Sequence, residues 1–295
     1  MSAGSILVPL DGSDKDARAL AIALALAELS GAELHLVHVL DQHAHDDSDS
    51  IAQRTAERRL EERAGELAVE QRARISWAIS TGGDVADELV RHAEERDALL
   101  VVMGTRAPTV VGRVIAGSVA DRVMRECTRP VVLVPPGTAY MAGKRIRFGR
   151  VLVPLDGSGL AERALDFLLR LPHANALEYV LLTVVPPGPE SRLMTGAADS
   201  DDARAPEMWL EEVAARARAH GLTAVETQVV EAADPSRIIA EAVREYLVEM
   251  IAMSTRGAGG LRRLVLGSVA EGVVRASEVP VLLLTPATLA RTHNP

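Results

Sequence analysis

One block of this sequence occurs twice. Val-Pro-Leu-Asp-Gly-Ser at residues 8–13 returns at 153–158, and Gly-Ser-Val-Ala at 117–120 returns at 267–270. The two offsets differ by about five residues, which we place in the Pro-rich stretch that begins at Pro186 of the second copy. A chain of 295 residues built this way is expected to form two homologous domains of ordinary size. We assign residues 1–138 to the first domain, 139–147 to a linker, 148–287 to the second domain and 288–295 to a polar tail.

Short apolar runs alternate with longer helical patterns in both copies. The expected strands are 5–10, 34–40, 75–79, 99–103 and 131–134 in the first copy, and 151–155, 179–185, 225–230, 249–253 and 281–284 in the second. Strands that alternate with helices across short turns favour parallel pairing with right-handed crossovers. The sequence therefore predicts an α/β fold made of two doubly wound domains, each a five-stranded parallel sheet with helices on both faces.

Composition excludes several classes of protein. The formal net charge of −9 argues against binding to nucleic-acid backbones, which needs a basic surface. The longest apolar run, residues 19–29, contains Glu28 and is too short to span a membrane, and the N-terminal residues do not resemble a signal peptide. Cys127 is the single cysteine, so an intrachain disulfide is excluded, and we expect a small buried residue at the end of a helix. We expect a cytoplasmic protein that binds neither nucleic acid nor membranes.

Candidate binding residues follow the first and fourth strands of each copy. The first strand leads to Asp11 or Asp156, and the fourth ends at Met103-Gly104 or Met253-Ser254. A Gly-Ser pair then begins the next helix. Ligands of doubly wound sheets lie beyond the carboxyl ends of the strands, where free N–H groups at a helix start suit phosphate. A carboxylate across the crevice suits a sugar hydroxyl or a base amine. The chain contains neither the Walker lysine motif nor Gly-x-Gly-x-x-Gly.

These motifs together resemble the universal stress protein family over essentially the whole chain. The resemblance rests on the repeated Val-Pro-Leu-Asp-Gly-Ser and Gly-Ser-Val-Ala motifs, on residues 253–257 and on residues 279–281. It implies a tandem member with two Rossmann-like domains of the adenine nucleotide alpha hydrolase type. Nucleotide-binding members carry Gly-x2-Gly-x9-Gly-[Ser/Thr] after the fourth strand to hold the ribose and phosphates of ATP. In them the Asp after the first strand and a Val at the end of the second hold the adenosine.

Carried over to this sequence, the family's motifs imply one ATP site in each copy, with or without Mg²⁺ or Mn²⁺. The residues of the first site, with their neighbours in the motifs, are Pro9, Leu10, Asp11, Val39, Met103, Gly104, Gly117, Ser118 and Val119. Those of the second are Pro154, Leu155, Asp156, Val184, Met253, Ser254, Gly257, Gly267, Ser268 and Val269. Arg106 and Arg256 occupy matching loop positions where a guanidinium could pair with phosphate, although a solvated surface role is an equal alternative.

Both copies depart from the family motif. Ala107 stands where the first copy should have its second Gly, and Ser254 stands where the second copy should have its first. An alanine methyl obstructs a phosphate approach and costs on the order of 1 kcal/mol if positive φ is needed, whereas a serine hydroxyl can itself bind. We therefore expect the second site to bind ATP better than the first.

The sequence does not supply a catalytic residue or a metal site. No Ser-His-Asp, Cys-His or paired-carboxylate arrangement is evident, so hydrolysis should be slow if it occurs. His38 and the His- and Asp-rich residues 41–49 fit no fixed ligand spacing and have no counterpart in the second copy, which favours a polar loop.

The leading hypothesis is a nucleotide-responsive stress or regulatory protein that acts through an unidentified protein partner. A dimerisation scaffold without nucleotide and a slow nucleotide hydrolase stay open as alternatives. The apolar fifth strands, 131–134 and 281–284, are edges that need covering, so we expect the two copies to pair within the chain; association of two chains is left open.

Overall fold

The computed structural model of the chain describes residues 4–40, 48–71, 74–105, 117–138, 146–188, 194–195, 203–255, 266–285 and 288. The chain divides into two compact units. The N-terminal unit comprises Met1–Pro136 with Tyr140–Ile146, and the C-terminal unit comprises Gly137–Ala139 with Arg147–Pro295. Each unit corresponds to one copy of the sequence repeat.

Strands and helices alternate along the described part of the N-terminal unit. Its elements are β1 (Ser5–Pro9), α1 (Asp14–Ser30), β2 (Glu33–Leu40), α2 (Ser48–Gln71), β3 (Ile75–Thr81), α3 (Val85–Glu95), β4 (Leu100–Gly104), α4 (Ser118–Glu126) and β5 (Val131–Val134). The strands lie in the order β3-β2-β1-β4-β5, and all four pairings are parallel. From β1 the chain adds β2 and β3 on one side and then β4 and β5 on the other, so the strand order reverses between β1 and β4.

The C-terminal unit repeats this order. Its elements are β6 (Arg150–Pro154), α5 (Gly159–Leu169), a 3₁₀ turn (Ala174–Ala176), β7 (Glu178–Val185), β8 (Met194–Thr195), β9 (Ala203–Arg204), α6 (Pro206–Ala219), β10 (Val225–Glu231), α7 (Pro235–Glu245), β11 (Met250–Ser254), α8 (Ser268–Ala276) and β12 (Val281–Leu284). The parallel sheet has the order β10-β7-β6-β11-β12. The short antiparallel pair β8 and β9 is additional and was not predicted. It lies between β7 and β10, where the second copy has its extra residues.

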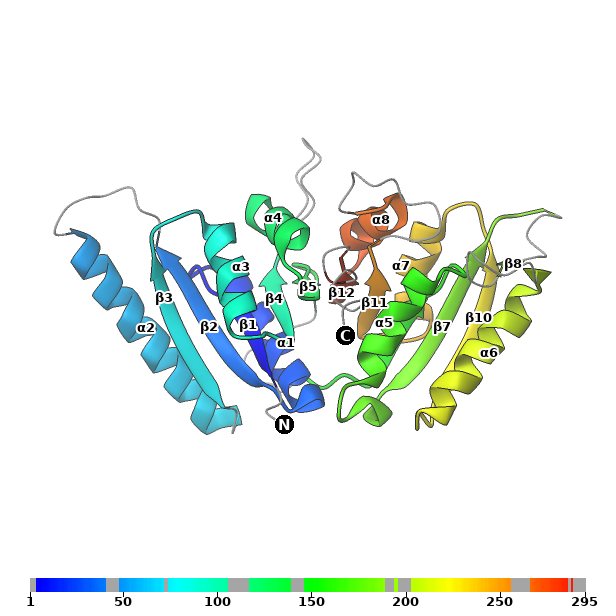
Figure 1. Ribbon diagram of the computed structural model, residues 1–295, viewed down its shortest axis with the longest axis horizontal. Coiled ribbons are helices and arrows are strands. Elements are labelled where there is room, and N and C mark those ends of the chain that lie inside the picture. Colours follow the sequence, from blue (N-terminus) through cyan, green and yellow to red (C-terminus); the bar gives the residue numbers. More distant parts are fainter. Residues whose placement is uncertain are drawn as a thin grey trace. The chain divides into compact units, whose positions relative to one another are not determined.

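The predicted fold is confirmed in both units, which have helices on both faces of each sheet (Figure 1). Central strands are buried completely: Ile6, Leu7 and Val8 of β1 and Val101 and Val102 of β4 expose none of their surface. Strands covered on both faces must be apolar along their whole length, which explains why the sequence shows continuous rather than alternating runs of Val, Ile and Leu. Strand ends match the expected ranges to within one or two residues.

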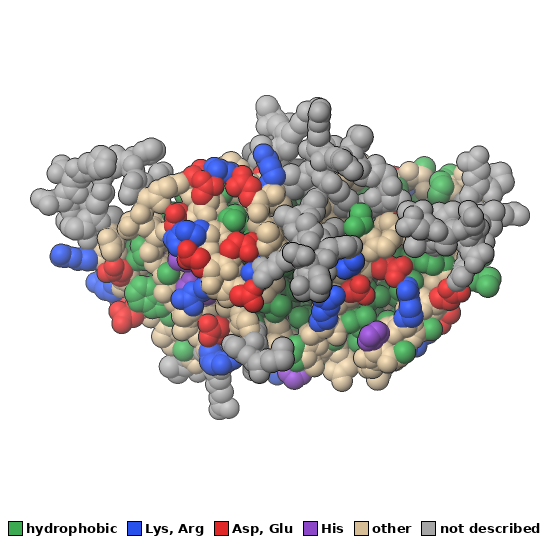
Figure 2. All heavy atoms as spheres, viewed as in Figure 1, with side chains coloured by type: hydrophobic (Ala, Val, Ile, Leu, Met, Phe, Trp, Pro, Cys, Tyr) green, Lys and Arg blue, Asp and Glu red, His purple; other side chains and the backbone are tan. Residues whose placement is uncertain are grey.

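The described surface agrees with the acidic composition. On the face shown in Figure 2, arginine and lysine side chains are interspersed with aspartate and glutamate. No basic patch gathers on the described part of that face. Among the described helices, none is both long and apolar enough for a bilayer crossing.

Candidate functional site

A cavity of about 450 Å³ lies at the carboxyl ends of β1 and β4 in the N-terminal unit. It is placed where the strand order reverses, which is the usual ligand position in an open α/β sheet. Its lining residues are Pro9, Leu10, Asp11, Lys15, Val37, Val39, Val85, Leu89, Met103, Gly104, Gly117, Ser118, Val119 and Ala120. This set contains every residue predicted for the first site except Arg106, which falls outside the described residues.

A turn after β1 presents Asp11 to the cavity. The Asp11 carboxylate accepts the N–H of Ser13 at 3.1 Å and forms an ion pair with the Lys15 ammonium at 2.6 Å. Burial raises the pKa of Asp11, but the hydrogen bonds from Lys15 and Ser13 outweigh it and lower the pKa to about 2. Asp11 is therefore ionised at neutral pH and can accept hydrogen bonds from a ligand.

The Asp16 side chain stabilises the same turn through hydrogen bonds. Its Oδ2 accepts the N–H groups of Asp11 at 3.0 Å and Gly12 at 2.7 Å, so a side chain in the first turn of α1 reaches back to the residues before the helix. Gly12 has φ +81°, a conformation that favours glycine. Burial raises the pKa of Asp16 to about 6, with a further contribution from the charge of Asp11.

Apolar side chains form one wall of the cavity. Val37 and Val39 come from β2, Leu89 from α3 and Met103 from β4. Such a wall can accept the flat face of a heterocyclic base. The sequence analysis missed five lining residues, namely Lys15, Val37, Val85, Leu89 and Ala120. The apolar ones look like ordinary core positions in sequence, so only the packing of α3 against β1, β2 and α4 brings them to one cavity.

The start of α4 also lines the cavity. Gly117 is the N-cap residue, with φ +101°, and Ser118 is the first helical residue. The first N–H groups of a helix have no partner within the helix and carry the positive end of its dipole, which suits an anion. The apolar wall, the carboxylate and the helix start together can hold a ligand that has a base at one end and a phosphate at the other.

Close packing explains Gly104 in the first copy. A Cβ atom there would lie 2.8 Å from Lys15 Cβ and 3.0 Å from the Lys15 carbonyl oxygen. The C-terminal unit has Ser254 at this position, and its helix α5 starts with Gly159 and Leu160 where α1 has Asp14 and Lys15. Ser254 thus departs from the family motif in the unit where α5, the counterpart of α1, also starts with different residues.

The predicted residues of the C-terminal unit occupy equivalent places. Pro154 ends β6 and is followed by Leu155 and Asp156, Val184 is in β7, and Met253 and Ser254 end β11. Gly267 is the N-cap of α8, which begins with Ser268 and Val269; Arg256 and Gly257 lie outside the described residues. β6 pairs with β11, so the two strand ends are neighbours.

Local hydrogen bonds at this second site differ from those of the first. Asp156 Oδ1 accepts the N–H of Ser158 at 3.0 Å and its hydroxyl at 2.6 Å. The N–H of Gly267 donates to the Thr255 carbonyl at 2.7 Å, so this one amide already has a partner. Gly267 has φ −71°, unlike Gly117. The two sites share their positions in the fold but not their detailed bonding.

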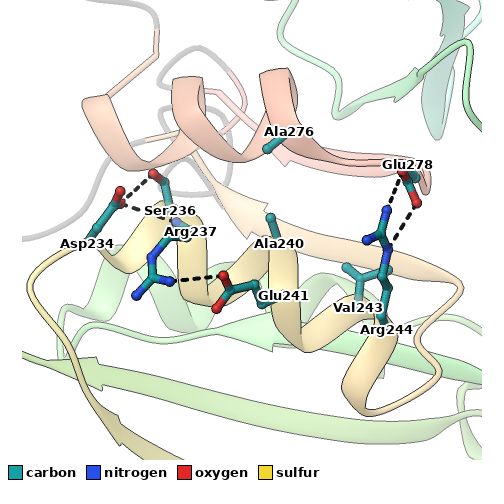
Figure 3. Close-up of a pocket in the computed structure, with 9 residues that line it drawn as sticks. All are labelled: Asp234, Ser236, Arg237, Ala240, Glu241, Val243, Arg244, Ala276 and Glu278. Carbon is teal, nitrogen blue, oxygen red and sulfur yellow. Dashed lines mark hydrogen bonds and ion pairs between the residues drawn. The ribbon is translucent and has the colours of Figure 1, made fainter.

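A second hollow, of about 430 Å³, lies between α7 and α8 of the C-terminal unit (Figure 3). Its charged side chains are paired with one another: Arg237 with Glu241 at 3.1 Å, and Arg244 with Glu278 at 2.6 Å. Asp234 accepts the Ser236 hydroxyl at 2.7 Å and caps the start of α7. None of the predicted site residues lines this hollow, and we assign its contacts to helix packing.

The described residues contain no group of three or more His, Cys, Asp or Glu side chains that could hold a metal ion. His38 Nδ1 lies 2.7 Å from the Leu10 carbonyl oxygen. Residues 41–47, the central part of the His- and Asp-rich loop, lie outside the described residues. Cys127 is buried at the end of α4, as expected.

Comparisons with known proteins agree with the duplicated architecture. The universal stress protein family model matches residues 3–135 and again residues 147–285. A universal stress protein of Thermus aquaticus is 34% identical over 134 residues, which cover 44% of this chain and 97% of that protein. Universal stress protein YxiE of Bacillus subtilis is 30% identical over 145 residues, again 44% of this chain and 97% of the relative.

A solved structure of similar length shares the fold. The crystal structure of a universal stress protein from Archaeoglobus fulgidus aligns with a TM-score of 0.70 and 22% identity, covering 96% of each chain. Together with the family match over both halves, this similarity leads to one conclusion. The chain belongs to the universal stress protein family, and it carries two consecutive copies of the family's domain.

Proposed function

We propose that the chain binds an adenine nucleotide, ATP in the first instance, and acts as a nucleotide-responsive stress or regulatory protein. The observation that carries this proposal is the cavity of the N-terminal unit. Residues predicted from separate segments of the sequence, including Asp11, Val39, Gly104 and Ser118, line the same 450 Å³ space. A volume of this size is within the usual range for small-molecule sites.

Each part of the cavity has a chemical counterpart in a nucleotide. The wall formed by Val37, Val39 and Met103 suits the faces of the adenine ring, and the Asp11 carboxylate suits its amino group or a ribose hydroxyl. The N–H groups at the start of α4 suit the phosphates. A divalent ion accompanying ATP would be bound mainly through the phosphates.

The second part of the proposal is that the chain binds ATP but does not hydrolyse it efficiently. Asp11 and Lys15 are the titratable side chains among the described lining residues. They are paired with each other at 2.6 Å, an arrangement that leaves neither as an obvious base for an attacking water. We therefore expect ATP hydrolysis to be slow if it occurs. Phosphate release that is abolished by Asp156→Ala or Gly267→Glu would favour the hydrolase alternative.

The direct test is nucleotide content and affinity. Purified protein is denatured, the released small molecules are separated by anion exchange, and ATP is titrated into the nucleotide-free protein by calorimetry. We expect adenine nucleotide in the released fraction and saturable ATP binding. Protein that releases no nucleotide and gives no binding heat with ATP would contradict the proposal and leave the scaffold alternative.

Glutamate substitutions at the two helix starts test whether ATP binds at the proposed site of each unit. Gly117→Glu and Gly267→Glu each place a carboxylate at a helix start proposed for phosphate, and we expect each to weaken ATP binding in its own unit at least tenfold. Gly117→Ala and Gly267→Ala are the matched controls: each adds a Cβ at the same strained or crowded position, where Gly117 has φ +101° and a Cβ at residue 267 would lie 3.1 Å from the Thr255 carbonyl oxygen, but neither adds a charge. The pair of variants also tests whether the second site is the stronger one, which stays a prediction.

A further inference from the structure

Among the described residues that line the N-terminal cavity, Lys15 is the cation, and the second repeat has an apolar residue at the equivalent position. The position that corresponds to Lys15 is Leu160, whose side chain is 38% exposed. Asp16, which braces the Asp11 turn, likewise corresponds to Ala161. The two copies have therefore diverged at two consecutive positions that adjoin the proposed ligand.

Packing holds Lys15 against the cavity. Its stem lies on Gly104, so closely that a Cβ at residue 104 would approach Lys15 Cβ and Cγ to 2.8 and 3.2 Å. Its ammonium lies 2.6 Å from Asp11 Oδ2, and the side chain is only 26% exposed. An ammonium has three donors and one ion pair engages a single direction, so the same group can also donate to a ligand oxygen.

The surrounding charges make this cation important for an anionic ligand. Asp11 lies in the cavity wall, and Asp16 lies beneath it with Oδ2 bonded to the N–H groups of residues 11 and 12. Two carboxylates close to the site would repel a phosphate. Lys15 offsets that repulsion where the ligand would lie.

We propose that Lys15 is a specificity-determining residue that makes the N-terminal site select phosphate-bearing nucleotides over uncharged nucleosides. This inference rests on the proposed adenine-nucleotide binding. The C-terminal site has Leu160 at the same position, so its described residues lack this source of discrimination. The two copies thus bind related ligands with different dependence on ligand charge.

The experiment compares AMP and adenosine on the full-length chain. A Gly267→Glu background weakens the C-terminal site, so that titration calorimetry follows the N-terminal one. The measured quantity is the ratio of the adenosine Kd to the AMP Kd. We expect Lys15→Leu, which copies the second repeat, to lower this ratio about tenfold or more, since a charge-assisted hydrogen bond is lost. Lys15→Arg keeps the charge and should retain most of the ratio.

The reciprocal change supplies a second measurement. In a Gly117→Glu background, Leu160→Lys should raise the preference of the C-terminal site for AMP over adenosine. If Lys15→Leu does not give a native circular dichroism spectrum, Lys15→Gln removes the charge while keeping most of the stem.

The outcomes separate this inference from the function on which it rests. An unchanged ratio in the charge-removing variant, with AMP still bound, overturns the role of Lys15 and leaves nucleotide binding intact. A wild-type chain that binds none of ATP, AMP and adenosine removes the proposed function, and this inference falls with it. A ratio that drops with Lys15→Leu and is retained by Lys15→Arg supports both.

Discussion

His35 is a buried imidazole in the core of the N-terminal unit, on β2 and outside the proposed site. Its side chain exposes none of its surface, its Nδ1 lies 3.0 Å from the Ser76 hydroxyl, and its Nε2 has no hydrogen-bond partner among the described residues. Its ring centroid is 5.7 Å from that of His92. Burial, together with the charges of Arg96 and His92, lowers the pKa of His35 to about 3. The repeat has Val180 at this position, so the fold does not require the imidazole.

This burial predicts an acid-dependent loss of stability in the N-terminal unit. The unfolded state takes up a proton below about pH 6.5 while the folded state resists it, so stability is complete above that pH and declines as the pH falls. Between pH 6.5 and 5.0 the loss amounts to about 2 kcal/mol. His35→Val should remove that part of the pH dependence.

The measurement is urea unfolding at pH 7 and pH 5, followed by Trp77 fluorescence in a Trp209→Phe background. Trp77 pairs with Leu36 on β2 and so reports this unit. Asp16 acts in the opposite direction, because its folded pKa is raised to about 6 and its contribution is lost as the pH rises through that value. Only the difference between wild type and variant therefore isolates His35. Equal pH dependence in the two proteins would contradict the prediction.

Helix pairs α3/α4 and α7/α8 occupy the same place in the two units but are joined by different contacts. In the first pair, Arg122 reaches from α4 to Asp84 at 2.9 Å and Asp87 at 2.6 Å. In the second pair, Gly272 stands at the position of Arg122 and lets α8 approach α7 directly. A Cβ at residue 272 would lie 2.5 Å from Ser236 Cβ and from its hydroxyl oxygen. The Arg122 side chain bridges the α3/α4 interface, whereas the α7/α8 interface requires a residue without a side chain at position 272.

This difference predicts opposite sensitivity to alanine. Gly272→Ala should destabilise the C-terminal unit by about 1–3 kcal/mol, because the new methyl group forces the helices apart. Arg122→Ala, the matched change in the other repeat, should have a clearly smaller effect, since its ion pairs are exposed to solvent. Urea unfolding followed by Trp209 in a Trp77→Phe background, and by Trp77 for the Arg122 variant, measures the two effects. A larger loss for Arg122→Ala would contradict this view of the interfaces.

At the scale of the whole molecule, the chain carries two complete copies of one α/β domain, each with its own buried sheet and its own candidate site. In both copies the aspartate accepts the N–H of the serine two residues later, but Asp11 also pairs with Lys15, and Asp156 also accepts the Ser158 hydroxyl. Gly117 and Gly267 also differ in backbone conformation. Ligand binding should therefore be measured separately for each unit.

Binding of nucleotide predicts protection from hydrogen exchange that is confined to the occupied unit. At a free ATP concentration one hundredfold above Kd, a site that binds only the folded state stabilises its unit by about 2.7 kcal/mol. Exchange followed by mass spectrometry should show slower exchange in peptides from β1, β4 and α4 when the first site is filled. A tenfold weaker site would lose about 1.3 kcal/mol of that stabilisation, so Gly117→Glu should reduce the protection of β1, β4 and α4 and leave protection in β6, β11 and α8 unchanged. Loss of protection in both units from this one substitution would contradict independent sites.

Much of the architecture could be predicted from the sequence. The duplicated Val-Pro-Leu-Asp-Gly-Ser motif predicted two domains, and the strands of both sheets were predicted to within one or two residues. Central strands such as β1 and β4 show as continuous apolar runs because both of their faces are covered, whereas the edge strands β3 and β10 are less buried and carry polar residues. The strand-end motifs also indicated where to look for a site. The brief pairing of β8 with β9 escaped prediction, since two-residue strands leave no periodic pattern.

The sequence by itself determined the duplication, the α/β class and the residues that follow each strand, because these depend on local order along the chain. Only the tertiary structure decided what surrounds them. Leu89 joins the cavity because α3 packs against β1, β2 and α4, and Lys15 joins it because α1 packs tightly on Gly104. Contacts of this kind form between segments distant in sequence, so hydrophobic periodicity and motif spacing, which are local patterns, do not predict them.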